Sequence, residues 1–152
     1  MNGLVIGLGN LARGDDAVGI EVAREIAAIA PPGVTVVETD DPASLLEVWE
    51  ASDRVVVVDA MCSNRPAGTA VAFDVRKTGL PAGNWAAGGT HAIGLATVVE
   101  LGRVLGRLPR HLVVVGVEAA STAPSQATTT QVADATGTAV RLVLDCLGAG
   151  GR

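Results

Sequence analysis

Two acidic residues and one histidine stand where α/β proteins usually carry out their chemistry. Asp16 opens an amphipathic segment after a glycine-rich turn, Asp59 ends a run of four valines, and His91 opens another helical segment after two glycines. An acid at the end of an apolar strand is costly to bury unless it is hydrogen-bonded, metal-bound or open to a cleft. One imidazole with two carboxylates is a set of N and O ligands that suits a borderline divalent ion.

Other polar residues have simpler structural explanations. Asp15 is expected to cap the helix that follows it, since carboxylates at helix starts accept hydrogen bonds from free backbone amides. His111 follows Pro109 and Arg110 at the start of an expected strand, which places it away from the edge where ligands bind. Cys62 is expected to be an ordinary free cysteine, because such residues mostly behave as small hydrophobes.

The elements that must position these residues follow from apolar patterning. Five short runs, most of them continuous and β-branched, predict strands at residues 4–6, 34–38, 54–59, 69–75 and 112–117. Between or after them, helical patterns predict helices at residues 17–30, 43–50, 93–105 and 131–147. Residues 76–89 and 119–130 read as loops because they are rich in Gly and Pro or in Ala, Ser and Thr.

The order of these elements predicts an α/β fold. Strands alternating with helices favour right-handed crossovers and a three-layer α/β/α sandwich around a mostly parallel twisted sheet. The run at 69–75 follows the third strand after a short turn, so we expect an antiparallel edge strand paired to it in a hairpin. We expect one domain over residues 1–147 and a flexible tail over residues 148–152.

This topology brings the candidate residues together. Ligands of open parallel sheets bind beyond the carboxyl ends of the strands, near the point where the strand order reverses. The turn leading to Asp16 follows the first strand, and Asp59 ends the third. We therefore expect Asp16, Asp59 and His91 to lie within metal-ligand reach of one another, with the 76–89 loop beside them.

Composition limits the classes of partner. The 152 residues carry a formal net charge of −5 and no cluster of Lys or Arg, which argues against nucleic acid and anionic membranes as partners. No apolar run reaches the roughly 18 to 20 residues that a membrane span needs. Two distant cysteines form no Cys-x-x-Cys pair, which fits a reducing compartment. We expect a cytoplasmic protein.

Several segments, in order, resemble those of hydrogenase maturation proteases. The opening resembles theirs in residues 6–10 (IGLGN) and 14–19 (GDDAVG), and later segments are similar in residues 55–60 (VVVVDA), 90–95 (THAIGL) and 113–118 (VVVGVE). The resemblance spans residues 3–145, nearly the whole chain.

This resemblance implies a monomeric endopeptidase that removes the C-terminal extension of a nickel-iron hydrogenase large-subunit precursor once nickel has been inserted. It also implies that Asp16, Asp59 and His91 contact the nickel, which belongs to the substrate. Metal-assisted hydrolysis and metal recognition are both compatible with such a site, and the absence of a His-Glu-x-x-His motif favours recognition.

The chain departs from the family pattern in one loop. Many members carry a Gly-Gly-Thr type loop after the second strand, whereas residues 38–43 read ETDDPA here. That loop is thought to face the substrate, so the cognate hydrogenase and the scissile bond do not follow from the resemblance. Asp16 stands where some members have Glu, which shortens the ligand arm by one methylene.

Three other interpretations remain at this level. A non-catalytic maturation factor would bind the nickel-loaded precursor without cleaving it. A nucleotide-binding module is suggested by Gly7-x-Gly9-x-x-Ala12 after a strand and by Glu38 at the end of the next, although Asp15 and Asp16 place negative charge where a pyrophosphate needs donors. A thiol enzyme would use Cys62 activated by His91.

Overall fold

The protein folds around one mixed sheet. The computed structural model describes residues 3–81, 85, 94–123 and 127–149, and the sheet runs in the order β2–β1–β3–β5–β4. The strands are β1 (Gly3–Leu8), β2 (Val34–Thr39), β3 (Arg54–Met61), β4 (Ala70–Asp74) and β5 (His111–Glu118). β4 is antiparallel to β5 and the other pairings are parallel. This arrangement confirms the predicted α/β class with one antiparallel edge strand.

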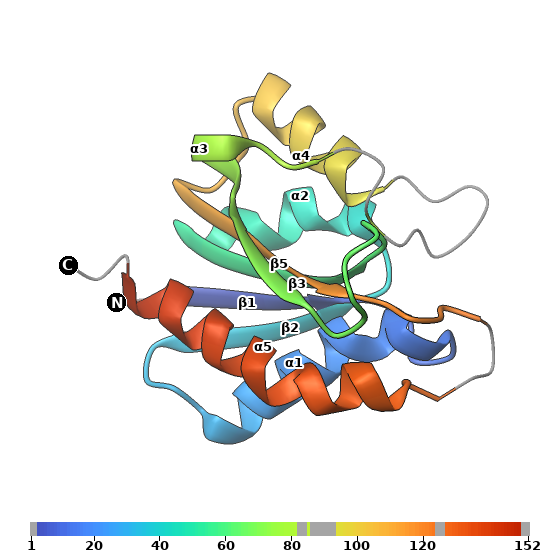
Figure 1. Cartoon of the computed structure of the whole chain (residues 1–152). Coiled ribbons are helices and arrows are strands. Elements are labelled where there is room, and N and C mark those ends of the chain that lie inside the picture. The colour runs from blue at the N-terminus through green and yellow to red at the C-terminus, as the bar shows by residue number, and fades with distance from the viewer. Residues whose placement is uncertain (1–2, 82–84, 86–93, 124–126, 150–152) are drawn as a thin grey trace.

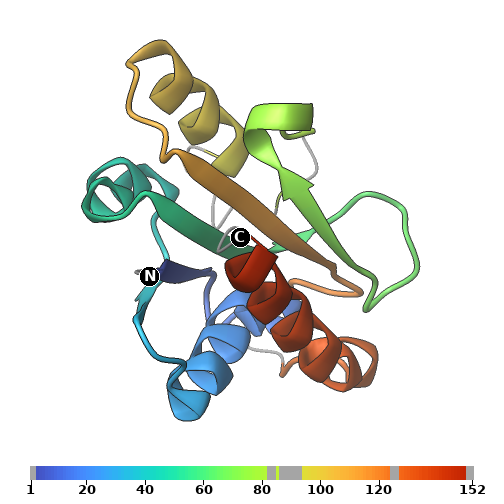
Figure 2. The same ribbon diagram turned by 90° about the vertical axis from the view of Figure 1, so that its left-hand side faces the viewer.

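Helices cover both faces of the sheet (Figures 1 and 2). The longer ones are α1 (Val18–Ile29), α4 (Leu95–Val104) and α5 (Thr130–Ala149), and the short ones are α2 (Leu45–Val48) and α3 (Val75–Thr78). Helices α1 and α5 pack on one face, whereas α2 and α4 pack on the other. In the described part of the chain, no helix is long and apolar enough to cross a membrane.

The valine run of β3 explains the two-sided core. Val55 and Val57 point toward the layer of α2 and α4, while Val56 and Val58 point toward α1 and α5. All residues of β3 are buried, because successive side chains of a strand face opposite sides and both sides are covered. The continuous apolar run therefore marked a central strand.

The predicted hairpin between the third and fourth strands is wrong. β5 lies between β3 and β4, so β4 pairs only with β5 among the described strands. Residues 62–69 cross the end of β5, where Gly68 N donates to Glu118 O and Glu118 N donates to Thr69 O, each at 2.8 Å. The turn residues predicted a reversal of direction correctly, but they carried no information on which strand is the neighbour.

Helix bounds also differ from the prediction in places. The segment predicted as one helix at 43–50 is a short α2 between two 3₁₀ turns, η2 (Pro42–Ser44) and η3 (Trp49–Ala51). The predicted 76–89 loop begins within α3, whose start is capped by the Asp74 carboxylate accepting from Lys77 N at 3.3 Å. Helix α5 continues to Ala149, two residues beyond the predicted bound.

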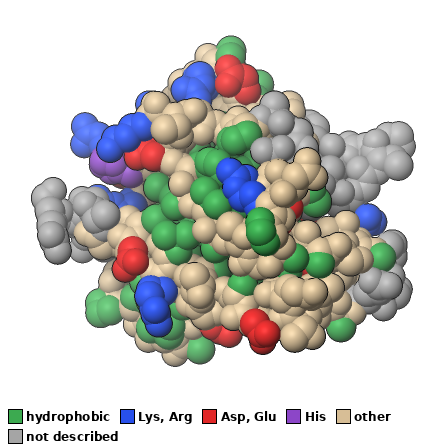
Figure 3. All heavy atoms as spheres, in the orientation of Figure 1, with side chains coloured by type: hydrophobic (Ala, Val, Ile, Leu, Met, Phe, Trp, Pro, Cys, Tyr) green, Lys and Arg blue, Asp and Glu red, His purple; other side chains and the backbone are tan. Residues whose placement is uncertain are grey.

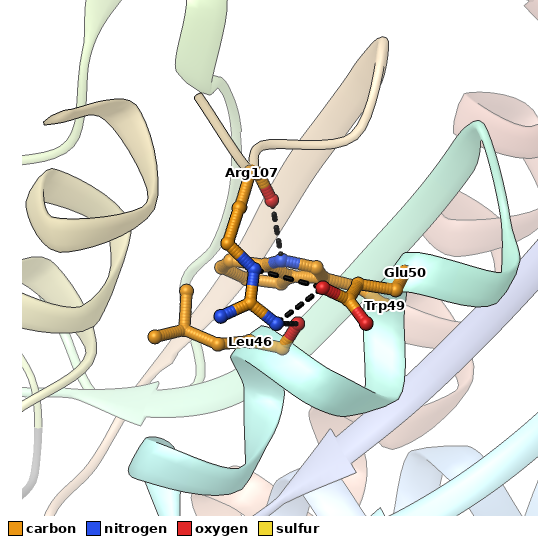
Figure 4. A network of polar contacts seen from close by, with 4 residues as sticks. All are labelled: Leu46, Trp49, Glu50 and Arg107. Carbon is orange, nitrogen blue, oxygen red and sulfur yellow. Dashed lines mark hydrogen bonds and ion pairs between the residues drawn. The ribbon is translucent and has the colours of Figure 1, made fainter. Parts of the chain in front are cut away.

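A polar network ties the α2 layer to the chain after α4 (Figure 4). The buried Trp49 indole donates to Arg107 O at 2.9 Å, and the Arg107 guanidinium contacts Glu50 and donates to Leu46 O. Because the Glu50–Arg107 pair is partly exposed, the ion pair itself contributes little stability. The network as a whole holds the turn after α4 against η3.

Close backbone contact fixes the start of α1 on the sheet. A Cβ at Gly19 would lie 2.3 Å from both Leu8 O and Val58 O, and one at Gly9 would lie 2.0 Å from Asp16 O. A Cβ at Gly7 would lie 2.5 Å from Gly19 O. No other residue type fits these positions unless the backbone moves. The glycines therefore determine how closely η1 (Gly14–Ala17) and α1 approach the ends of β1 and β3.

We predict that Gly19→Ala destabilises the protein by about 3 kcal/mol or more, since the added methyl group meets two backbone carbonyls. Gly137→Ala is the matched control, because Gly137 is also helical and a methyl group added there would have nothing within 4 Å. The free energy of unfolding of Gly137→Ala should rise by about 0.5 to 1 kcal/mol, because alanine has the higher helix propensity. Urea unfolding measures the free energy of unfolding of both variants. Equal effects of the two substitutions would contradict the packing role of Gly19.

Candidate active site

Asp16 and Asp59 lie at the carboxyl edge of the sheet, as predicted. Asp59 is in the last part of β3, and Asp16 is in η1, which packs against the ends of β1 and β3. Asn10 N donates to Asp16 O at 3.2 Å, which closes the turn between β1 and η1. Both side chains are buried, with exposed fractions of 3% for Asp16 and 1% for Asp59.

The two carboxyl groups interact electrostatically. Burial raises the pKa of Asp16 from 3.8 to about 6, although Arg13 and the Asn10 amide act in the opposite direction. Burial also raises the pKa of Asp59 well above its ordinary value, and the negative charge of Asp16 raises it further. The Ala60 amide, which donates to Asp59 Oδ1 at 2.9 Å, opposes this rise only in part. Burial therefore disfavours ionisation of both groups, and the charge of Asp16 disfavours ionisation of Asp59 further.

Such a pair is suited to binding a cation. Burial and the charge of Asp16 favour the protonated form of Asp59, and a divalent ion between the two acids would relieve both the desolvation and the repulsion. His91, the third predicted ligand, lies outside the described residues. Within the described residues, no three His, Cys, Asp or Glu side chains form a group that could hold a metal ion. The structure thus brings together two of the three predicted residues and leaves the third a prediction.

Asp15 does not cap a helix, contrary to the prediction. Its fully buried carboxylate accepts from the backbone amides of Ala120, Ser121 and Thr129 at 2.6 to 2.9 Å, and from the Thr129 hydroxyl. Asp15 N in turn donates to Ser121 O at 2.7 Å. Asp15 therefore joins η1 to both ends of the loop after β5. The sequence could not reveal this, since the partners lie more than a hundred residues away.

Glu118 is a buried acid of this region that the sequence analysis did not assign to the site. It ends β5, is 3% exposed, and accepts from Ser63 N at 2.8 Å and from the Ser63 hydroxyl. Arg65 donates to the same hydroxyl at 2.6 Å. The sequence did indicate Glu118 as a candidate site residue, because it ends an apolar run just as Asp59 does. Its contacts hold the 62–69 loop next to the carboxyl edge.

Cys62 lies close to the acids but is poorly suited to be a nucleophile. Its pKa is raised by partial burial and then by the charges of Glu118, Asp16 and Asp59. A catalytic cysteine needs the opposite, an environment that stabilises the thiolate. These surroundings argue against the thiol-enzyme interpretation.

The glycine-rich turn is used for packing. In a dinucleotide-binding site the second glycine lets the pyrophosphate approach the backbone. Here Asp16 O occupies the space next to Gly9, and Glu38 forms a two-point ion pair with Arg24 at 3.0 Å. The geometry therefore disfavours the nucleotide-binding interpretation.

His111 begins β5 at the amino end of the parallel strands, away from the carboxyl edge as predicted, and its side chain is exposed.

Comparison with known families and structures gives consistent results. A family model described as "Hydrogenase maturation protease" (HycI) matches residues 20–146. No curated protein matches the sequence. Among solved structures, the hydrogenase maturating endopeptidase HybD from E. coli is 28% identical, with a TM-score of 0.79 over 99% of this chain and 94% of that one.

Two archaeal structures have the same fold. The [NiFe] hydrogenase maturation protease HycI from Thermococcus kodakarensis KOD1 is 24% identical, with a TM-score of 0.74 over 97% of this chain and 92% of that one. HybD from Thermococcus kodakarensis is 20% identical, with a TM-score of 0.72 over 95% and 98%. The sheet order and the antiparallel edge strand described above thus agree with known maturation proteases.

We predict that Asp16→Asn stabilises the protein at neutral pH. A folded-state pKa above the unfolded value means that the native state binds the proton more tightly, so wild-type stability falls as pH rises from about 4 to about 6. The amide cannot ionise, and should add about 1 to 3 kcal/mol at pH 7.5 and nothing near pH 3. Denaturant unfolding across this range provides the measurement. Asp53→Asn, at an exposed position before β3, is the control for replacing a carboxylate that is not buried.

Proposed function

Because the chain belongs to the hydrogenase maturation protease family and is therefore an endopeptidase of hydrogenase maturation, we propose that it removes the C-terminal extension of a nickel-loaded large-subunit precursor. Nickel belongs to this substrate and is bound at the protease by Asp16, Asp59 and His91. The observation that supports this most directly is the pair of buried carboxyl groups with raised pKa values at the carboxyl edge of the sheet. Carboxylate oxygens and an imidazole are suitable donors for nickel.

The carboxyl pair makes binding conditional on the metal. Without a cation, burial and the charge of Asp16 favour the protonated form of Asp59, so a precursor that lacks nickel does not meet two ionised carboxylates. A precursor that presents nickel gains the coordination of both carboxylates as the proton on Asp59 leaves. Selectivity then comes from completing the metal's coordination sphere, and sequence readout contributes less.

Peptide cleavage requires a water molecule to lose a proton as it attacks the scissile carbonyl. In this proposal Asp16 or Asp59 accepts this proton as general base. The same proton can then pass to the leaving amine. In this proposal one set of side chains both recognises the loaded precursor and promotes hydrolysis.

The cellular setting is part of the proposal. A monomer in the cytoplasm, acting without nucleic acid or membrane, fits a protein whose cysteines, including the exposed Cys62, are free. It also fits a net charge of −5 with no cluster of basic residues in the sequence.

We predict that processing depends on nickel in the precursor. Incubation of the purified protein with a nickel-loaded large-subunit precursor should remove one defined C-terminal peptide, measured by intact mass. Apo precursor, or a free peptide spanning the same bond, should stay intact. Efficient cleavage of metal-free precursor would contradict the recognition role and leave conventional acid–base hydrolysis.

A second prediction separates the proposed ligands from the neighbouring thiol. His91→Ala and Asp59→Asn should reduce processing at least a hundredfold, whereas Cys62→Ala should process at close to the wild-type rate. The reason is that the first two substitutions remove metal ligands, while the raised pKa of Cys62 leaves its thiol protonated. Circular dichroism and urea unfolding check that each variant folds. Comparable losses for Cys62→Ala and His91→Ala would favour thiol chemistry.

A further inference from the structure

The outer edge of β4 is unusually accessible for an edge strand. β4 reads Ala-Val-Ala-Phe-Asp, with no Pro or Lys to discourage pairing, and no described strand pairs with its outer side. Proteins commonly protect such edges with charges, prolines or covering segments. In Figures 1 and 2 the strand, light green and joined to α3, is the outermost of the sheet. Hydrophobic side chains gather on the face of the molecule where it lies (Figure 3).

The register shows which backbone groups face outward. Thr69 O accepts from Glu118 N, and the pairs that follow in the ladder are Val71 with Gly116 and Phe73 with Val114. In an antiparallel ladder these alternate residues direct their backbone groups toward the partner strand. Ala70 and Ala72 therefore direct their N–H and C=O groups, and Asp74 its N–H group, to the outer edge, where they can pair with a further strand. Asp74 O already accepts from the Thr78 hydroxyl at 3.1 Å.

Two hollows flank β4, one on each face of the sheet. On one face a hollow of about 500 Å³ is lined by Ala72 and Asp74 together with Val113 and Cys146. On the other face a hollow of about 440 Å³ is lined by Phe73 together with Leu80 and Val99. A strand added outside β4 would point successive side chains to opposite faces, toward one hollow and then the other. Main-chain pairing combined with pockets for alternate side chains is the usual basis of peptide recognition by strand addition.

The strand register also shows how far the outer edge of β4 lies from Asp59. Asp59, Gly116 and Val71 lie on one line across β3, β5 and β4. A strand added at this level would lie three strand spacings from Asp59, or about 14 Å. An extended chain covers that distance in about four or five residues. A peptide on the edge of β4 would reach the acids by passing over the 62–69 loop, which crosses the end of β5.

We infer that β4 binds an extended segment of the hydrogenase precursor near its cleavage site, which adds as a sixth strand and leads the scissile bond to Asp16 and Asp59. This inference rests on the proposed function. The side chains of the segment would enter hollows of mixed lining. Val113 and Cys146 line one hollow together with Asp74 and Lys77, and Leu80 and Val99 line the other together with Glu100 and Arg103. The proposed occupant is a strand of the substrate, because the register places this edge three strand spacings from Asp59.

The test uses a proline on the outer edge. In Ala72→Pro the lost N–H points outward, so the pairing with β5 is kept, and Ala72 is exposed, so little packing changes. Ala72→Thr keeps the N–H and is the control at the same site. Val36→Pro is the control on the opposite edge, because Gly3 N donates to Gly33 O and Gly9 N to Thr39 O, which places the Val36 N–H outward on β2.

With nickel-loaded precursor, Ala72→Pro should raise KM at least tenfold and leave kcat near the wild-type value, while both controls keep the wild-type KM. A free peptide that contains the precursor's C-terminal region, at millimolar concentration, should slow amide exchange at Ala72 and Asp74 in the wild-type protein. Urea unfolding checks that the proline variant keeps its fold.

The outcomes separate the two proposals. Cleavage by the wild-type protein with no exchange protection at β4 and a normal KM for Ala72→Pro would overturn this inference alone. Protection of β4 that rises with protein concentration in the absence of peptide would overturn it in favour of self-association. If the wild-type protein neither binds nor cleaves the nickel-loaded precursor, the proposed function fails and this inference fails with it.

Discussion

The active edge of this protein depends on the close contact between the start of α1 and the ends of β1 and β3. Gly7, Gly9 and Gly19 allow backbone to meet backbone there, because a single methyl group at any of them would overlap a carbonyl oxygen. This contact is what brings Asp16, on the helical side, next to Asp59, on the sheet. Asp15 secures the same junction from the other side through the loop after β5. The glycine-rich sequence therefore has a geometric function first, and its chemistry follows from the geometry.

At this junction two carboxyl groups are buried, which makes their ionised forms unfavourable. Burial raises both pKa values, and the charge of Asp16 raises that of Asp59 further, so the folded protein carries a cost at neutral pH that a neutral side chain would not. The neighbouring Asp15 shows that the fold can satisfy a buried acid fully when the acid only holds loops together. The adjacent residues thus differ, because Asp15 accepts hydrogen bonds from three backbone amides and a hydroxyl, whereas burial raises the pKa of Asp16.

Much of this could be derived from the sequence, and the failures share a physical origin. The central strands and the positions of Asp16 and Asp59 follow from local patterns, since continuous apolar runs and strand ends are visible in short windows. The partner of β4 and the role of Asp15 depend on contacts between segments far apart, such as Gly68 with Glu118 and Asp15 with Thr129. No local pattern encodes such pairs. Glu118 is a different case, because its position resembled that of Asp59 and the same reasoning would have found it.

The insertion of β5 between β3 and β4 also affects the order in which the chain can assemble. During synthesis β4 emerges directly after β3, but its only described partner strand ends at Glu118. At the usual rate of about 5 to 20 residues per second, the segment Ala-Val-Ala-Phe remains without its neighbour for several seconds. The parallel strands β1, β2 and β3 can pair in this interval, so the sheet grows from its centre and closes on the β4 side last. A nascent chain of this protein therefore exposes its most apolar edge until β5 has been made.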